Sequence, residues 1–336
     1  ATPQVKELAE RYFFIRIWAA PATMTLMAVR GWLVGMQNSI DSMFLDLIIN
    51  VVNIVASIAL AFGVGSWQGL GFVGIPLGTV IAQYCGLLYG LWACSRKYGR
   101  SVFSLLRRED LTNLVHDGSM GSFFKMNLDL LARSVFFILI YIGFTMINAG
   151  FGDLMLACGS IIMQLLMFFS YFTDGFAYAG EALAGRFIGA RDAGMLRKSI
   201  RYVFAWSMGI GIFFIGIYFF AGTPVVRLLT SDETVVAACR QFLPWLLLMP
   251  PLGCAAFTWD GIYMGATASR TFRDAMGGAA LAFFAIWFLG RWLLQPVGPL
   301  ALHVLFAAYF AHLAFRTFWL TYRHRRDVLG AIPENA

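Results

Sequence analysis

The sequence predicts an all-α integral membrane protein, and three features indicate this class. Sixty per cent of the 336 residues are hydrophobic and only 13 per cent are charged, so a soluble domain of this length could not cover its apolar surface. Apolar spans long enough to cross a bilayer recur along the whole chain. Lysine and arginine gather in alternate connections between these spans, which is typical of a chain that passes repeatedly through a membrane.

Nine transmembrane helices are expected in order along the chain. They span residues 11–36, 42–64, 72–95, 123–148, 154–186, 198–221, 236–262, 271–294 and 299–322. Glycine and proline mark several of the connections, including Gly150 and Gly152 after the fourth helix and the run 222–224 after the sixth.

The longest connection, residues 96–122, separates the first three helices from the last six. Its apolar residues recur at helical spacing among charged ones, which predicts an amphipathic helix on the inner membrane surface. We therefore expect four regions: a partial first lobe at 1–95, an amphipathic linker at 96–122, a second lobe at 123–323 and a tail at 324–336.

Basic residues predict the orientation of the chain. They cluster after the third, fifth, seventh and ninth helices, and the last cluster is Arg323, Arg325 and Arg326. Because positively charged connections stay on the cytoplasmic side, we expect a cytoplasmic C-terminus and, after nine crossings, an outside start.

An internal repeat relates the first helix to the seventh. Adding 230 to the residue number pairs Pro21 with Pro251, Gly31 with Gly261, Gly35 with Gly265 and Ser39 with Ser269. Both helices would run from outside to inside, so the repeats would be parallel. The fourth to sixth helices have no counterpart, and we therefore expect a six-plus-six protein whose first three helices are missing from this chain.

The stretch from Thr173 to Asp192 combines acidic and small residues. It places Asp174 and Glu181 two turns apart on one helix face, directly after an apolar span. Because a charge that faces lipid is costly, this segment must face other helices or water. We expect the rest of the chain to surround it.

Several segments resemble the multidrug and toxic compound extrusion (MATE) transporters, in the branch named after DNA-damage-inducible protein F. They are YFFIRIWAAPATMTLMAVRGWLVGMQNS, NVVNIV, GTVIAQYCGLLYGLW, DGFAYAGEALAGRFIGARD and DGIYMGATASRTFRDAM. The resemblance implies the last three helices of an N-lobe and a complete six-helix C-lobe of a twelve-helix, V-shaped transporter. It also implies antiport by alternating access, in which amphipathic or cationic compounds leave in exchange for protons or sodium ions.

The resemblance carries further expectations. The protein should be a monomer in the inner membrane of a bacterial cell, with H⁺ or Na⁺ as the coupling ion and no other cofactor. Its partners should be small-molecule substrates and membrane lipids. Nucleic acid is not expected, because the net charge of +7 is divided among short basic clusters between apolar spans. The first-helix aspartate that is central to coupling in this family has no counterpart here.

Five intramembrane charges are candidates for ion coupling or gating: Asp260, Asp174, Asp129, Glu181 and Arg133. Asp129 and Arg133 are four residues apart, which predicts an ion pair within one helix. Asp260 and Asp174 have no basic residue on their own helix turn, so we expect unpaired carboxylates. In other branches of the superfamily a coupling carboxylate lies on the helix of Asp260.

Two further charge pairs are geometrically possible. Glu181 could be neutralised by Arg186, which follows it on the same helix. In the first lobe, Arg30 and Asp46 fall on the same side of the membrane and could form an ion pair.

A soft, adaptable substrate cavity could be lined by methionine and polar side chains. The candidates are Met146, Asn148, Met163, Gln164 and Met167. Lipid-facing packing is the alternative for each methionine. His303 and His312 are nine residues apart and fall on opposite faces of a helix, which does not favour a metal site.

Other functions remain open. A lipid-linked precursor flippase of the same superfamily would share the fold, but should place more cationic residues in its cavity than Arg133 and Arg16. An inactive, truncated transporter is a further alternative. An enzyme is not expected, because the sequence contains no nucleophile elbow, phosphate loop or HExxH motif.

Overall fold

The computed structural model describes residues 3–65, 67–105 and 119–332, and the regular structure of these residues is helical. Nine stretches of the described chain are long and apolar enough to cross a membrane. They are Glu7–Gly35, Ser39–Phe62, Gly71–Gly99, Met120–Ala149, Asp153–Gly189, Ala193–Arg227, Glu233–Gly265, Ser269–Leu294 and Pro299–Ala331. The expected all-α membrane class with nine spans is confirmed.

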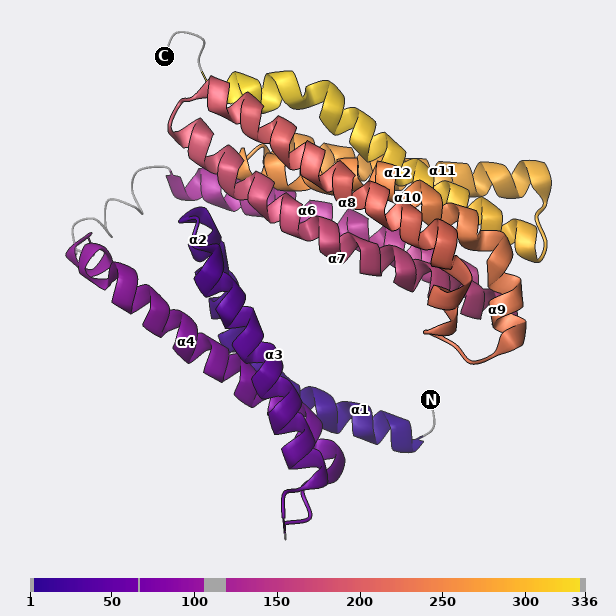
Figure 1. The fold of residues 1–336 in the computed structure, drawn as a ribbon, viewed down its shortest axis with the longest axis horizontal. Helices are drawn as coiled ribbons and strands as arrows, with labels where there is room; N and C mark the ends of the chain where they lie inside the picture. The colour runs from indigo at the N-terminus through magenta and orange to yellow at the C-terminus, as the bar shows by residue number, and fades with distance from the viewer. Residues whose placement is uncertain (1–2, 66, 106–118, 333–336) are drawn as a thin grey trace. The chain divides into compact units, whose positions relative to one another are not determined.

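The chain divides into two compact units, Ala1–Asp117 and Gly118–Ala336. Unit 1 contains α1 (Pro3–Arg16), α2 (Ala20–Gly35), α3 (Ser39–Phe62) and α4 (Gly74–Leu105) (Figure 1). Helix α3 packs along α4, since Gly74 and Gly78 allow the backbone of α4 to approach that of α3 closely. The core of this unit is small, and its buried residues are Leu26, Leu33, Leu45, Ile49 and Ala82.

The third helix is longer than expected. We predicted an end at residue 95 and a separate linker from 96, but α4 continues to Leu105. The first charged residues after the apolar span find partners without leaving the helix, because Lys97 binds Asp41 at 2.8 Å and Arg96 lies 5.3 Å from the Trp92 ring. The rest of the predicted amphipathic helix falls largely on 106–118, outside the described residues.

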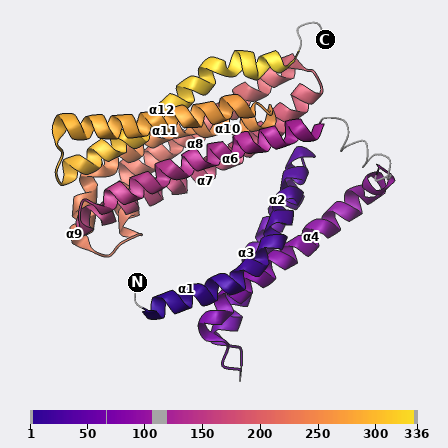
Figure 2. The ribbon, with the colours of Figure 1, turned by 180° about the vertical axis from the view of Figure 1, so that it is seen from behind.

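Unit 2 contains seven α-helices in the described chain. They are α6 (Ser119–Ala149), α7 (Asp153–Gly189), α8 (Ala193–Arg227), α9 (Glu233–Cys239), α10 (Leu243–Gly265), α11 (Ser269–Leu294) and α12 (Pro299–Asp327). The six long ones lie side by side as a bundle, and both views show α9 at one end of it (Figures 1 and 2). One buried cluster, rich in aromatic residues, fills most of this bundle. A smaller cluster around Trp259, Phe272 and Leu320 fills the end near the C-terminus.

The predicted connection at 222–224 is wrong. Helix α8 runs on to Arg227 through a kink, where Ala221 has non-helical angles (φ −122°, ψ 16°) and Pro224 lies inside the helix. Proline removes one helical hydrogen bond and bends a helix without always ending it. The connection comes later, and there the Asp232 side chain accepts a hydrogen bond from the N–H of Thr234 at 2.8 Å and caps α9. Hydrogen bonds from the Thr234 hydroxyl and N–H lower the pKa of Asp232.

Three tight turns share one geometry. Gln37, Arg191 and Thr267 have positive φ values of 57°, 56° and 53°, and each turn is closed by the same pattern of backbone hydrogen bonds. The repeat alignment pairs Gln37 with Thr267, so the two repeats agree locally at this turn. The prolines differ in context, since Pro21 lies in the first turn of α2 and Pro251 lies inside α10.

Candidate functional site

Asp260 lies at the centre of a partly buried charged cluster in unit 2. Its Oδ2 accepts a hydrogen bond from Arg133 Nη2 on α6 at 2.9 Å, and its Oδ1 lies 3.5 Å from Arg316 Nε on α12. The expectation that Asp260 is unpaired is therefore wrong. Both arginines come from other helices, so a search along its own helix could not find them.

Arg316 is the residue that the sequence analysis missed. Its side chain is only 1% exposed, and its guanidinium lies 5.2 Å from the Phe257 ring. Within the described chain, its Nε and Nη2 form no hydrogen bond. An arginine stays charged in a protein, so nearby carboxylates must balance it. The signal was present in the sequence as a single arginine within a largely apolar span, HLAFRTFWL.

Asp174 on α7 completes the cluster. It is half-buried and interacts electrostatically with both Asp260 and Arg316, although it forms no ion pair with a described residue. The cluster therefore joins two carboxylates and two guanidinium groups from α6, α7, α10 and α12. Arg133 is additionally held over the Phe272 ring, 4.1 Å from its centroid. The opposite charges are equal in number, which allows the group to be buried.

Close packing of α7 and α10 brings Asp174 near Asp260. A Cβ added to Gly261 would collide with the backbone carbonyl of Ala177, and one added to Gly265 would collide with that of Glu181. Two glycines four residues apart therefore let the helices approach at backbone distance, as is common for helices in membranes. The carboxylates lie next to this contact, one on each helix.

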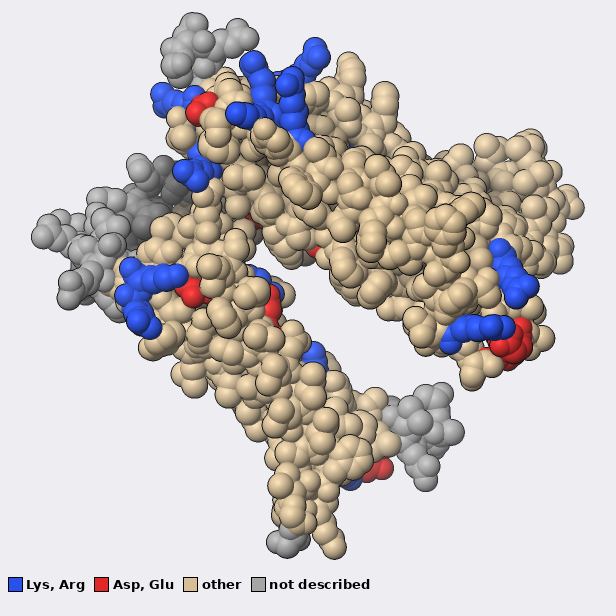
Figure 3. Space-filling view, in the orientation of Figure 1, with Lys and Arg blue, Asp and Glu red and all other residues tan. Residues whose placement is uncertain are grey.

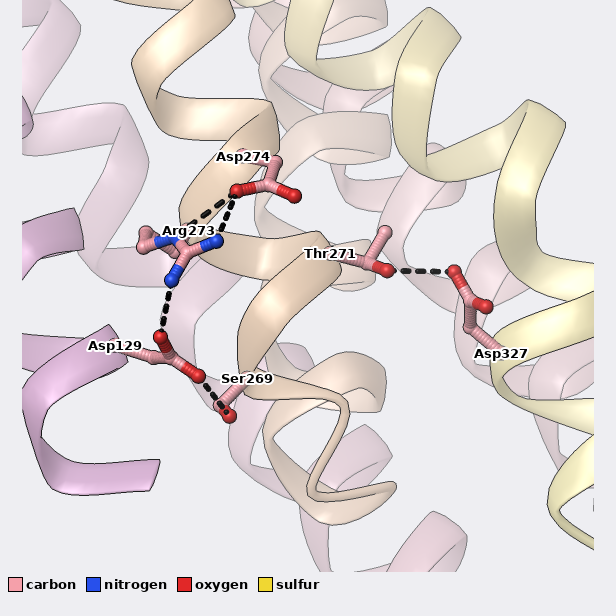
Figure 4. A network of polar contacts seen from close by, with 6 residues as sticks. All are labelled: Asp129, Ser269, Thr271, Arg273, Asp274 and Asp327. Carbon is pink, nitrogen blue, oxygen red and sulfur yellow. Dashed lines mark hydrogen bonds and ion pairs between the residues drawn. The ribbon is translucent and has the colours of Figure 1, made fainter. Parts of the chain in front are cut away.

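The predicted ion pair between Asp129 and Arg133 is not formed. Instead, Asp129 accepts hydrogen bonds from Arg273 Nη1 at 2.5 Å and from Ser269 Oγ at 2.9 Å (Figure 4). Asp129 lies beside the start of α11, whereas Arg133, one turn further along α6, reaches Asp260. Each residue therefore pairs with a residue on another helix and not with its neighbour on α6.

A second polar network connects α6, α11 and α12 near the start of α11. Arg273 also binds Asp274, at 2.7 Å and 2.9 Å, and Thr271 donates a hydrogen bond to Asp327 at 2.7 Å (Figure 4). Arg323 Nε binds the same Asp327 carboxylate at 3.1 Å. The network links α6, α11 and α12 and lines a cavity of about 610 Å³.

The predicted substrate-cavity residues do not converge on one space. Asn148 and Met163 are buried in the packed interior, where Asn148 donates a hydrogen bond to the carbonyl of Leu156 at 3.3 Å. Met167 packs against the same core, whereas Met146 and Gln164 are exposed. Met163 and Gln164 are neighbours in sequence and therefore point about 100° apart around α7.

The remaining candidates have structural surroundings. Glu181 lies two turns beyond Asp174, where its backbone faces Gly265, and its pairing with Arg186 stays a prediction. His303 Nδ1 accepts a hydrogen bond from Trp245 Nε1 at 3.0 Å, and His312 is buried against the Tyr309 ring. In the first unit, Arg30 and Asp46 form the expected ion pair. Among the described residues, no cluster of metal-binding side chains is found.

Comparisons with known proteins place the chain in a family. The MatE family model matches residues 130–276. DNA damage-inducible protein F of Escherichia coli K12 is 31% identical over 304 residues, which are 90% of this chain and 64% of that protein. The probable multidrug resistance protein NorM of Photorhabdus laumondii is 24% identical over 294 residues, 85% of this chain and 61% of that protein. The chain thus spans somewhat less than two thirds of the length of these two relatives.

Solved structures share the fold. The Vibrio cholerae MATE transporter VcmN, crystallised in the bent form, matches with a TM-score of 0.78 and 15% identity over 98% of this chain and 72% of that chain. With its all-helical membrane fold and its similarity to DNA damage-inducible protein F, the chain belongs to the MATE family, a family of membrane transporters and not of enzymes.

Proposed function

We propose that the protein to which this chain belongs exports amphipathic or cationic compounds in antiport with protons or sodium ions. The family supports transport, and one relative is named a probable multidrug resistance protein. Alternating access of the two lobes, with the domain boundaries expected from the sequence, is part of the proposal. So are a bacterial inner membrane, a cytoplasmic C-terminus and a monomeric state.

The cluster around Asp260 carries this proposal. Asp260 is held between Arg133 and Arg316, and the contact to Arg316 at 3.5 Å lacks a hydrogen bond. A proton or a sodium ion bound at Asp260 would weaken its hold on both arginines, and the nearby Asp174 would become the alternative partner of Arg316. An exchange of partners of this kind would shift α12 against α10, which is the coupling step that antiport needs.

The second network has a proposed gating role. Asp129 and Arg273 hold the end of α6 against the start of α11, and Asp327 holds α12 against the same segment. Such a latch must open if the end of unit 2 is to move. Glu181 lies next to the α7–α10 contact, so its surroundings would change in the same movement. Gln164 and Met146, as exposed side chains, remain candidates for substrate contact.

Transport by reconstituted protein tests the coupling role. The natural full-length protein would be placed in liposomes, and the movement of ethidium would be followed under imposed proton or sodium gradients. We expect Asp260→Asn to abolish gradient-driven movement while ethidium binding is retained. Asp232→Asn, in an exposed connection, is the matched control and should transport normally. Unchanged transport by Asp260→Asn under both gradients would reject the role of Asp260.

A lipid-linked precursor flippase is the second candidate, because Arg316 adds an interior cation that the sequence analysis had not counted. An anionic substrate would need a cation that is free to bind it. Arg316 and Arg133 both face Asp260 instead, which favours export of cationic compounds. Movement of a fluorescent anionic lipid, lost in Arg316→Gln and unaffected by ion gradients, would support the flippase.

A further inference from the structure

A basic cavity of about 880 Å³ lies at the end of unit 2, between the α7–α8 turn and the C-terminal end of α12. Its charged lining consists of Arg191, Arg197, Arg201, Arg325, His324 and Asp192. Lysine and arginine side chains visibly gather over this end of unit 2, near the C-terminus of the chain (Figure 3). None of the residues of this cavity belongs to the Asp260 cluster or to the second network.

The positive charge of this cavity is not compensated by the described residues. Its one carboxylate, Asp192, accepts a hydrogen bond from the N–H of Met195 at 2.8 Å and so caps α8. The four arginines form no ion pair within the described chain. The neighbouring Arg323 and Arg326, in contrast, both lie within ion-pair distance of Asp327 and face the other cavity. Asp327 thus pairs with arginines of the other cavity, whereas the four arginines of this cavity have no such carboxylate among the described residues.

Apolar side chains form the rest of the lining. Ile200, Leu329 and the buried Ile332 contribute to it, and Ile332 belongs to the smaller core cluster. Directly beyond Arg201, α8 exposes Tyr202 and Trp206 on one face, 58% and 69% exposed. Tyrosine and tryptophan at this position on a membrane helix are typical of the interface between headgroups and acyl chains. We therefore expect the cavity to lie at headgroup level, with the exposed Tyr202 and Trp206 next to it on α8.

We propose that this cavity binds the phosphate group of an anionic phospholipid. Guanidinium groups recognise phosphate oxygens with paired hydrogen bonds, and several arginines from different elements can surround one phosphate. Basic cavities between helices near the membrane surface bind lipid headgroups in this way. Free phosphate from solution offers the same chemistry, and the experiment separates the two sources. Such a site goes beyond the transport proposal, because it requires no coupling ion and no exported compound.

The test measures binding to the purified full-length protein in a nonionic detergent. The probes are dioleoylphosphatidylglycerol, dioleoylphosphatidylcholine and sodium phosphate, all at one ionic strength, and the readouts are the thermal unfolding midpoint and native mass spectrometry. We expect phosphatidylglycerol to raise the midpoint and to remain bound, and phosphatidylcholine to do neither. The double variant Arg197→Gln/Arg201→Gln should bind phosphatidylglycerol roughly thirtyfold more weakly, because each arginine near an anionic surface contributes about 1 kcal/mol to binding.

The control variant removes the same charge from the opposite end of unit 2. Arg240→Gln/Arg291→Gln changes two exposed arginines that do not line this cavity, and it should bind phosphatidylglycerol as the wild type does. If sodium phosphate alone raises the midpoint as far as the lipid, and the cavity variant loses the effect, the source is free phosphate. Equal binding of phosphatidylglycerol by the wild type and the cavity variant would overturn the proposal. Equal binding of the two lipids by the wild type would also overturn it.

Discussion

Gly261 and Gly265 in α10 have the same spacing as Gly31 and Gly35 in α2, yet the two pairs have different surroundings. A Cβ at Gly261 would collide with the backbone of Ala177, whereas a Cβ at Gly31 or Gly35 would meet no atom of unit 1 within 4 Å. Two small residues four apart permit two helices to approach closely but do not supply the second helix. The motif therefore shows where a contact is possible, and the fold decides whether it forms.

Charged residues show the same contrast between the units. In unit 2, Asp260 is 15% exposed and lies between two arginines, one of them almost fully buried. In unit 1, the pair of Arg30 and Asp46 is 37% and 48% exposed. Burial decides how much such a pair contributes to stability. Removing one partner leaves the other charge uncompensated, and this costs much more free energy at a buried position than at an exposed one. Substitutions at matched positions can test this difference.

The largest effect is expected from Gly261→Leu. The added side chain would occupy space now held by the backbone of α7, and neither backbone can yield without separating the helices. We expect a loss of roughly 4 kcal/mol in the stability of unit 2. Gly31→Leu, its repeat counterpart, should change the stability of this chain by less than about 0.5 kcal/mol. Unfolding in mixed detergent micelles would measure both, and equal losses would contradict the contrast.

The next effect is expected from Asp260→Asn. It leaves Arg316 and Arg133 without their shared carboxylate, at a cost of about 3 kcal/mol. Asp46→Asn in unit 1 should cost less than about 1 kcal/mol, since its ion pair with Arg30 is half exposed. A double-mutant cycle of Asp260→Asn with Arg316→Gln should show strong non-additivity. Additive losses would mean that the two residues do not interact.

A smaller effect is expected from Arg273→Gln. The substitution removes an ion pair with the buried Asp129, but Ser269 still donates a hydrogen bond to that carboxylate. We expect a loss of about 1–2 kcal/mol in the unfolding free energy. Replacing Ser269 with alanine as well should enlarge the loss beyond the sum of the two. A change of less than a few tenths of a kcal/mol in the unfolding free energy would show that this network does not hold the helix ends together.

The smallest effects are expected where both partners of an ion pair are exposed. Arg11→Gln removes the pair with Glu7, in which both side chains are 62% exposed, and Arg227→Gln removes the pair with Glu233. Each should cost less than about 0.5 kcal/mol. Here the two units should behave alike, because both side chains of each pair are mostly exposed. A clear difference between them would show that burial is not what distinguishes the units.

Hydropathy and sequence motifs were sufficient to predict the membrane class, the nine spans and the family. A span of about twenty apolar residues is required by the thickness of the bilayer, so hydropathy along the chain is sufficient to find it. Precise ends were harder to predict. Helix α4 passed its expected end because Lys97 and Arg96 found partners, and α8 continued through Pro224 as a kinked helix.

The partners of the charged residues, in contrast, depend on how the helices pack in the folded chain. Sequence spacing reveals neighbours on one helix, and it therefore paired Asp129 with Arg133 and left Asp260 unpaired. In the folded chain, Arg133 reaches Asp260 across 127 positions in the sequence, and Arg273 reaches Asp129 across 144. A buried charge gains most from a partner on a facing helix, where both are shielded from water. Which helices face each other depends on packing, here on the backbone contact that Gly261 and Gly265 allow between α7 and α10.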